Sequence, residues 1–191
     1  MERIGIYGGS FNPVTCGHLL VARAALEEAQ LDRLHFVPAA QSPFKPDQLL
    51  ASGDARCRWL RLALAGWERC ELDDQELKRG GVSYTVDTLR DYARRFPDAT
   101  LCYLIGADHL CKLPQWRDAG TLANLAEFLV IPRPGEVAAA LPPPFRGRLL
   151  KGFPLGVSAS EVRARLKAGL PIAGLVPETA VEIIEKSGLY L

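Results

Sequence analysis

The sequence predicts an α/β protein built on a doubly wound parallel sheet, with a small helical part at its C-terminal end. Short apolar runs alternate along the chain with longer segments whose apolar residues recur at helical spacing. In addition, a glycine-bearing loop at residues 8–18 connects the first apolar run to the first helical segment. Strands that alternate with helices favour right-handed crossovers and a parallel sheet, where ligands bind beyond the carboxyl ends of the strands.

The short apolar runs are the predicted strands. The clearest reads L-C-Y-L-I and is apolar throughout, as is typical of a strand that is buried on both faces. The predicted strands cover residues 4–7, 34–37, 70–72, 101–105, 128–131 and 148–150.

Segments with apolar residues on one face are the predicted helices. Ser52 is placed to cap the second of them, in which Trp59, Leu60 and Ala63 share a face. The proline-bearing segments between elements are predicted loops. The predicted helices cover residues 19–29, 52–66, 84–95, 159–168 and 177–187.

Composition limits the domain count and the class of partner. A chain of 191 residues is long enough for one domain, 1–191, in which residues 157–191 form the C-terminal helical part. The formal net charge is +1 and no long basic run occurs, so we expect no nucleic-acid partner. No apolar stretch approaches the roughly 20 residues of a membrane span, and the N-terminus leaves no room for a signal peptide. We therefore expect a cytoplasmic protein with no membrane association.

The cysteines and isolated histidines predict neither a disulfide framework nor a metal site. The chain has 5 cysteines, an odd number, with no C-x-x-C spacing. Cys16 lies in the glycine-bearing loop, where we expect it to be a small residue that fills a variable position. His35 and His109 lack a metal-ligand partner at suitable spacing, so we expect structural roles for both.

The loop between the first strand and the first helix predicts a nucleotide-phosphate site. It reads G-G-S-F-N-P-V-T-C-G-H over residues 8–18. Its glycines let the backbone turn sharply and approach a phosphate, while free N–H groups and the helix dipole attract an anion. His18, in the first helical turn, would direct its imidazole at that anion. The loop has neither a dinucleotide fingerprint nor a Walker ending, and the simpler interpretation is an ordinary strand–helix turn.

A second segment, residues 157–163, reads V-S-A-S-E-V-R before an apolar-periodic run. Ser158 or Ser160 is placed to cap the helix that follows. On these residues alone, Arg163 could equally be a solvated helix arginine.

Together the two segments resemble the signatures of the nucleotidyltransferase α/β-phosphodiesterase superfamily, G-G-[ST]-F-[DN]-P-x-[HT]-x-G-H and [IV]-S-[AS]-[ST]-x-[IV]-R. This resemblance implies a Rossmann-like nucleotidyltransferase fold. It also implies that His18 contacts the phosphates of ATP and that Arg163 holds the β- and γ-phosphates. The residues expected to bind ATP are Gly8, Gly9, Ser10, Phe11, Gly17, His18, Gly106, Asp108, Ser158, Ser160 and Arg163.

Adenylyl transfer joins a phosphate oxyanion to the α-phosphorus of ATP and expels pyrophosphate. The nucleophile is already ionised, so catalysis needs positioning and electrostatic stabilisation rather than a general base. We expect the catalytic donors to be Thr15, His18, Lys45 and Arg163. We expect Mg²⁺ to arrive bound to ATP, without a metal site of the protein's own.

Further segments resemble the bacterial nicotinate mononucleotide adenylyltransferases, and the resemblance covers nearly the whole chain. They read G-V-S-Y-T-V-D-T-L from residue 81, I-G-A-D from residue 105 and R-P-G from residue 133. This resemblance implies that nicotinate mononucleotide is the acceptor and that deamido-NAD and pyrophosphate are the products. The face of Trp116 would stack on the pyridinium ring, and N–H groups at a helix start would bind its carboxylate. The residues expected to bind the acceptor are Ser83, Tyr84, Thr85, Trp116 and Arg133, while Asp108 suits a ribose hydroxyl.

Two positions depart from this branch and leave alternatives open. Thr15 stands where most members carry a histidine and where phosphopantetheine adenylyltransferases carry threonine, so a hydroxyl replaces a positive charge. Ala39 and Ala40 stand where asparagines often touch substrate. The alternatives are a phosphopantetheine adenylyltransferase-like enzyme and a non-catalytic nucleotide-binding module. The sequence also leaves the oligomeric state open, including a homo-oligomer.

Overall fold

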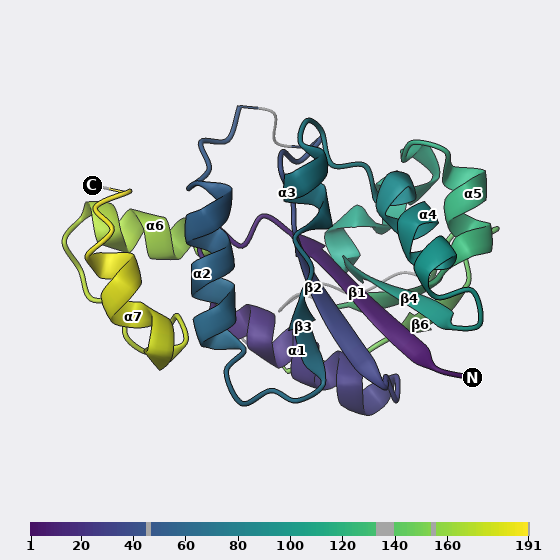
Figure 1. The fold of residues 1–191 in the computed structure, drawn as a ribbon, viewed down its shortest axis with the longest axis horizontal. Helices are drawn as coiled ribbons and strands as arrows, with labels where there is room; N and C mark the ends of the chain where they lie inside the picture. The colour runs from purple at the N-terminus through teal and green to yellow at the C-terminus, as the bar shows by residue number, and fades with distance from the viewer. Residues whose placement is uncertain (45–46, 133–139, 154–155, 191) are drawn as a thin grey trace.

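The chain folds around one parallel sheet (Figure 1). The computed structural model describes residues 1–44, 47–132, 140–153 and 156–190. The sheet order is β3-β2-β1-β4-β5-β6, and every neighbouring pair of strands is parallel. The strands are β1 (Arg3–Gly9), β2 (Arg33–Pro38), β3 (Cys70–Leu72), β4 (Thr100–Gly106), β5 (Glu127–Ile131) and β6 (Gly147–Leu149).

Every predicted strand and helix is present, so the predicted fold class is confirmed. Three short helical segments were not predicted, namely α3, η1 and α5. Helices α3 and α5 have only 5 and 7 residues, which are too few to show a period, and η1 is a 3₁₀ helix that contains Pro114. The helices are α1 (Cys16–Glu28), α2 (Gly53–Ala63), α3 (Gln75–Arg79), α4 (Thr85–Arg95), η1 (Ala107–Gln115), α5 (Ala119–Leu125), α6 (Ala159–Lys167) and α7 (Glu178–Glu185).

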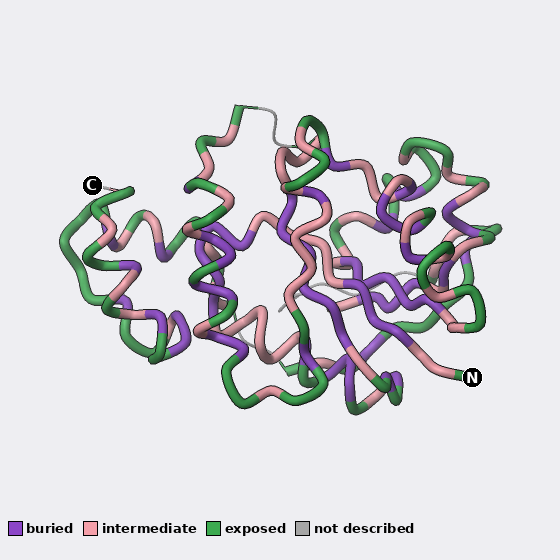
Figure 2. The backbone as a smooth tube through the Cα atoms, in the orientation of Figure 1, coloured by how far each residue is buried: buried purple, intermediate pink, exposed green. Residues whose placement is uncertain are grey.

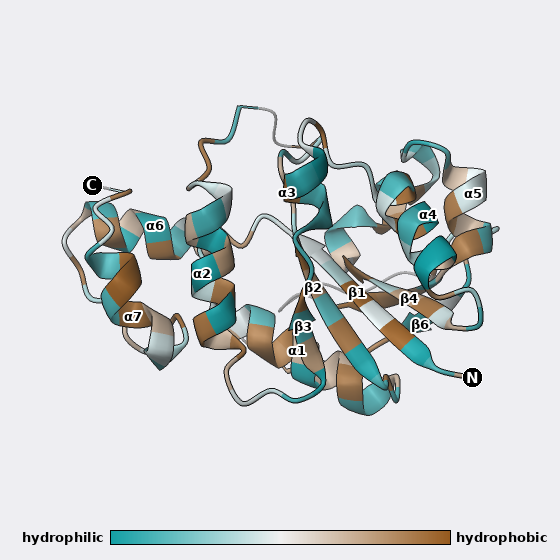
Figure 3. Ribbon diagram, viewed as in Figure 1, coloured by the Kyte–Doolittle hydropathy of each residue, from teal (hydrophilic) through white to brown (hydrophobic). Residues whose placement is uncertain are grey.

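Helices cover the two faces of the sheet. Strand β4 shows the alternation, because Cys102 packs in the cluster with α1 and α2, whereas Tyr103 packs in the cluster with α4, η1 and α5. The buried parts of the backbone concentrate in the strands and in the inward turns of the helices (Figure 2). Brown apolar segments alternate with teal polar ones along the same helices (Figure 3), as expected of amphipathic helices on a sheet.

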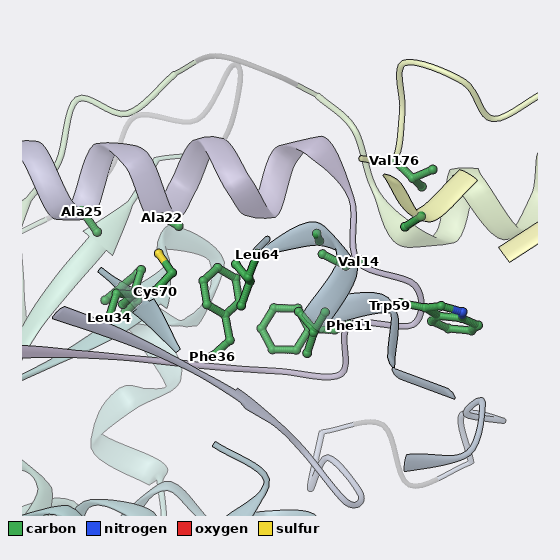
Figure 4. Close-up of a cluster of buried hydrophobic side chains, with 14 of the residues drawn as sticks. Phe11, Val14, Ala22, Ala25, Leu34, Phe36, Trp59, Leu64, Cys70 and Val176 are labelled. Atoms are coloured by element: carbon green, nitrogen blue, oxygen red, sulfur yellow. The ribbon is translucent and has the colours of Figure 1, made fainter. Parts of the chain in front are cut away.

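The C-terminal helices α6 and α7 pack beside α2, at the end of the molecule away from the N-terminus (Figure 1). Val176 belongs to the same buried cluster as Phe11, Phe36 and Trp59, and Figure 4 labels these four residues. The hydroxyl of Thr179 in α7 also donates to a backbone carbonyl at the end of α2, at 2.9 Å. The helical part that begins at residue 157 therefore shares a core with the sheet.

The strand order places a switch point between β1 and β4. Strand β1 is followed by α1 and pairs with β2, while β4 on its other side is followed by η1. Connections leave these two strands on opposite faces, which opens a crevice beyond their carboxyl ends. In the described part of the chain, no helix has the length and apolarity needed to cross a membrane.

Candidate active site

A cleft of about 470 Å³ lies beyond the carboxyl ends of β1 and β4, at the switch point of the sheet. It collects most of the residues that the sequence singled out, from segments far apart in the chain. The predicted site residues that line it are Gly8, Gly9, Ser10, Phe11, Thr15, Gly17, His18, Ser83, Thr85, Gly106, Trp116, Ser158, Ser160 and Arg163.

Two of the remaining four predicted site residues are described and are not among those that line the cleft. Tyr84 places its ring under the guanidinium of Arg117, at 4.5 Å, and Asp108 lies 3.7 Å from the imidazole of His109. The other two, Lys45 and Arg133, lie outside the described residues. Direct roles for these four residues stay predictions.

His18 is held by the start of its own helix. Thr15 is the N-cap of α1, and the Nδ1 atom of His18 accepts from the Thr15 backbone N–H at 2.9 Å. The hydroxyl of Thr15 lies 2.8 Å from the same Nδ1 atom and accepts from the His18 backbone N–H at 3.4 Å. With Nδ1 accepting, a neutral imidazole carries its proton on Nε2. This reciprocal cap therefore sets both the orientation and the tautomer of His18.

Thr15 is itself held within this cap. Its side chain is 1% exposed and is already engaged with His18. The imidazole in turn packs edge-on against the ring of Phe11, with centroids 5.0 Å apart. Thr15 thus acts on the cleft mainly through the orientation of His18.

Two glycines allow close approaches that a side chain would prevent. A Cβ atom on Gly8 would lie 2.6 Å from the hydroxyl of Tyr103, across the cleft from the loop. A Cβ atom on Gly17 would lie 3.0 Å from the carbonyl oxygen of Val157, which precedes α6. Because both positions are glycine, the loop lies close to Tyr103 and to the segment that precedes α6.

The second motif combines a helix cap with a cleft-facing arginine. Ser158 caps α6 by accepting from the Glu161 backbone N–H at 3.1 Å, so its interpretation as a cap was correct. Arg163 is half-buried and donates to the hydroxyl of Ser160 at 3.0 Å and to the carbonyl of Asn12 at 2.7 Å. Arg163 is therefore fixed against the first motif rather than solvated.

The other side of the cleft is aromatic. The Thr85 hydroxyl donates to that of Tyr103 at 3.3 Å, and Trp116 stands nearly perpendicular to Tyr103 with centroids 6.2 Å apart. Burial raises the pKa of the Tyr103 phenol, which keeps it protonated. Helix α4 begins at Thr85, and no side chain caps it among the described residues. The N–H group of Asp87 donates to the Tyr84 carbonyl. Those of Thr85 and Val86 have no acceptor among the described residues and are available for an anionic group.

Sequence reasoning missed two charged residues that support the cleft. Glu76 lines it at 5% exposure, accepts from the Thr88 hydroxyl at 2.5 Å and has its pKa raised by burial. It lies in a five-residue helix with no motif to mark it. Arg56 is 2% exposed and donates to the carbonyl of Ser10 in the glycine-bearing loop. The sequence did indicate that Arg56 is buried, because it lies on the apolar face of α2, three residues before Trp59.

Comparisons with known proteins agree with this geometry. A family model described as cytidylyltransferase-like matches residues 6–165. The chain is 41% identical over 190 residues to a probable nicotinate-nucleotide adenylyltransferase of Opitutus terrae, covering 98% of this chain and 97% of the relative. It is 38% identical to a protein of the same description from Shouchella clausii, over 100% of this chain and 97% of the relative.

A solved structure shows the same fold. It is the nicotinic acid mononucleotide adenylyltransferase of Plasmodium falciparum complexed with NaAD, which superimposes with a TM-score of 0.80 at 21% identity. The match covers 100% of this chain and 98% of that one. With the family model over most of the chain and full-length relatives near 40% identity, this chain belongs to the cytidylyltransferase-like family and, within it, to the nicotinate-nucleotide adenylyltransferases.

Proposed function

We propose that this protein transfers the adenylyl group of ATP to nicotinate mononucleotide, giving deamido-NAD and pyrophosphate in NAD biosynthesis. The observation that carries the proposal is that one cleft joins a two-sided polyphosphate cradle to an aromatic pocket with an open helix N-terminus. The full-length relatives bear the name of the same activity.

The cradle is formed by the first and second motifs. The loop residues 8–11, His18 and Arg163 all line the cleft, and Arg163 donates to the carbonyl of Asn12 in that loop at 2.7 Å. The starts of α1 and α6 add their dipoles, which favour negative charge at the same place. In our proposal His18 and Arg163 hold the polyphosphate of ATP, so that its α-phosphorus faces the acceptor side.

The aromatic side suits a nicotinate ring. The ring is a pyridinium cation that bears a carboxylate, so a tryptophan face and free N–H groups match its two charges. Trp116 provides the indole, and the start of α4 at Thr85 provides the N–H groups. Lys45 remains a proposed donor to the polyphosphate, and Arg133 remains a proposed residue for binding the acceptor.

The reaction needs no proton acceptor on the enzyme. A phosphate oxygen of the mononucleotide attacks the α-phosphorus of ATP, the bond to the β-phosphate oxygen breaks, and pyrophosphate leaves. The donors of the cradle lower the repulsion between the two anions and take up charge on the leaving group. Mg²⁺ enters as part of the Mg-ATP substrate, whose phosphates and waters suit its coordination. The described cleft residues supply N–H groups and cations for the phosphates, and no group of three His, Cys, Asp or Glu side chains able to hold a metal occurs among the described residues.

A direct assay tests the proposal. Purified protein is incubated with labelled Mg-ATP and, in separate reactions, nicotinate mononucleotide, nicotinamide mononucleotide or 4′-phosphopantetheine, and pyrophosphate release is measured. We expect the fastest turnover with nicotinate mononucleotide and none without an acceptor. Activity with phosphopantetheine alone would support that alternative acceptor. Binding of ATP without turnover on any acceptor would support a non-catalytic nucleotide-binding module.

A further inference from the structure

We propose that Arg56 is a positioning residue. It sets the geometry of the phosphate loop, residues 8–18, and connects this loop to the acceptor side of the cleft, which Ser83, Thr85 and Trp116 line. The proposal rests on the function proposed above, and it assigns a role to a side chain outside both motifs. Arg56 does not line the cleft, so it acts through the backbone that it holds.

The guanidinium of Arg56 holds three backbone carbonyls from three separate segments. Its Nη1 atom donates to the carbonyl of Ser10 at 2.9 Å and to that of Ala39 at 2.7 Å. Its Nε atom donates to the carbonyl of Ala51 at 3.0 Å. These carbonyls belong to the phosphate loop, to the segment after β2 and to the entry of α2, so one side chain fixes their relative positions.

The positive charge of Arg56 has no carboxylate partner among the described residues. Burial lowers the pKa of the guanidinium, but an arginine stays protonated in a protein. The neighbours that affect its pKa are Cys57 and Tyr190. Burial raises the pKa of both groups, so neither is ionised at neutral pH. A buried cation without a counter-ion is costly, and the polyphosphate of ATP in the adjacent loop would supply the opposite charge.

The hydrogen bonds of Arg56 reach both sides of the cleft through peptide groups. The carbonyl of Ser10 shares its peptide with the N–H of Phe11, a residue of the phosphate loop that lines the cleft at a φ of 44°. A carbonyl that accepts from a cation polarises its peptide, so that N–H becomes a stronger donor. The carbonyl of Ala39 shares its peptide with the N–H of Ala40, which donates to the Ser83 hydroxyl at 2.9 Å. Arg56 thereby connects the loop that holds ATP to the acceptor side.

Lysine cannot reproduce this arrangement. The planar guanidinium directs its donors to several carbonyls in fixed directions, whereas an ammonium is a single point charge on a flexible stem. Arg56→Lys therefore keeps the charge and removes the fixed geometry, while Arg56→Met removes both. Arg58 on the same helix is exposed, so Arg58→Lys and Arg58→Met are matched controls.

For each variant the experiment measures analogue binding, steady-state kinetics and a melting curve. Calorimetry gives the dissociation constant for a non-hydrolysable Mg-ATP analogue, which does not depend on turnover or on the identity of the acceptor. Steady-state kinetics give kcat and the KM values for ATP and nicotinate mononucleotide. For Arg56→Lys we expect a folded protein with analogue binding weakened roughly tenfold and kcat lowered roughly 10- to 100-fold, as for misplaced reacting groups. The Arg58 variants should match wild type.

Two results would overturn the positioning role. One is Arg56→Lys with analogue affinity, kcat and both KM values within twofold of wild type. The other is a lower melting temperature with unchanged affinity and kcat, which indicates a merely structural role. If wild type proves inactive toward nicotinate mononucleotide, the proposed function fails, but the analogue affinities of Arg56→Lys and Arg58→Lys still decide the role of Arg56. The comparison of Arg56→Lys with Arg56→Met separates geometry from charge, and if Arg56→Met does not fold, Arg56→Lys decides the test.

Discussion

The two sides of the cleft are built in different ways. On the side proposed to hold the polyphosphate (the polyphosphate side), hydrogen bonds hold His18 through Thr15, and Arg163 through Asn12 and Ser160. On the acceptor side, Trp116 is placed mainly by ring contacts with Tyr103, Phe44 and His109. Fixed donors suit the growing charge of a transition state, whereas ring contacts suit the shape of a substrate. Changes on the first side should mainly affect turnover, and changes on the second should mainly affect the choice of acceptor.

The largest expected effect is that of His18→Ala, on the polyphosphate side. We expect kcat to fall by about 10²- to 10³-fold, because a preorganised donor to the phosphates is lost. The measurement is steady-state pyrophosphate release at saturating substrates, with a melting curve for each protein. His35→Phe, which removes a histidine from the sheet core, is the control at pH 8. Turnover of His18→Ala within a few-fold of wild type would remove His18 from the catalytic machinery.

Arg163→Ala should give the next largest effect and should distinguish the two substrates. Charge-assisted hydrogen bonds contribute about 1.5–3 kcal/mol, which corresponds to roughly 10- to 100-fold in the KM for ATP. The KM for nicotinate mononucleotide should change much less. Lys167→Ala, at the exposed end of the same helix, is the matched control. Equal changes in both KM values would mean that Arg163 does not act on the polyphosphate side alone.

The acceptor side should select the acid over the amide. A carboxylate can accept from the N–H groups at the start of α4, whereas the amide of nicotinamide mononucleotide would direct its own donors at them. Each buried group left unpaired costs about 1–3 kcal/mol, so we expect at least a roughly tenfold preference in kcat/KM for nicotinate mononucleotide. Initial rates with each mononucleotide at saturating Mg-ATP give this ratio, and equal efficiencies would contradict a carboxylate site at Thr85.

Trp116→Ala separates stacking from carboxylate recognition in the same assay. Because stacking acts on the ring in both mononucleotides, the variant should weaken both and leave their ratio nearly unchanged. A changed ratio with unchanged affinities would instead place the carboxylate near the indole.

The smallest expected effect lies away from both sides and concerns stability. His35 is buried beside Tyr92 and Phe96, and its Nε2 atom has no hydrogen-bond partner among the described residues. Burial lowers the pKa of its imidazole below the value of about 6.5 for an unfolded chain. The folded state therefore favours neutral His35, and this contribution to stability is complete above about pH 6.5 and is lost as the pH falls.

The comparison of wild type with His35→Phe isolates this contribution. Between pH 7.5 and pH 5.5, the free energy of unfolding of wild type should fall faster than that of His35→Phe, by at most about 1.4 kcal/mol per pH unit. Urea denaturation at each pH measures the difference. Parallel pH profiles would show that His35 does not titrate differently in the folded and unfolded states.

The fold class and the helix caps beside the cleft were predictable because their signals are local. Apolar periodicity depends on neighbours a few residues apart, and so do the caps at Thr15 and Ser158. The segments that carry these caps resembled known signatures, and they do line the cleft. Resemblance to relatives indicated the acceptor. Trp116, whose indole is expected to stack on that acceptor, also lines the cleft.

The sequence by itself therefore determined the alternation of elements, the helix starts and the types of residue that the cleft contains. Only the tertiary structure decided which side chains reach it. It places the ring of Tyr84 against Arg117 and Asp108 beside His109, and it makes Arg56 a support for the phosphate loop. Such placements depend on carbonyls and rings that are distant in sequence and are brought together by packing across the sheet. A local pattern can specify a turn or a cap, but the partner of a buried side chain is chosen by the whole fold.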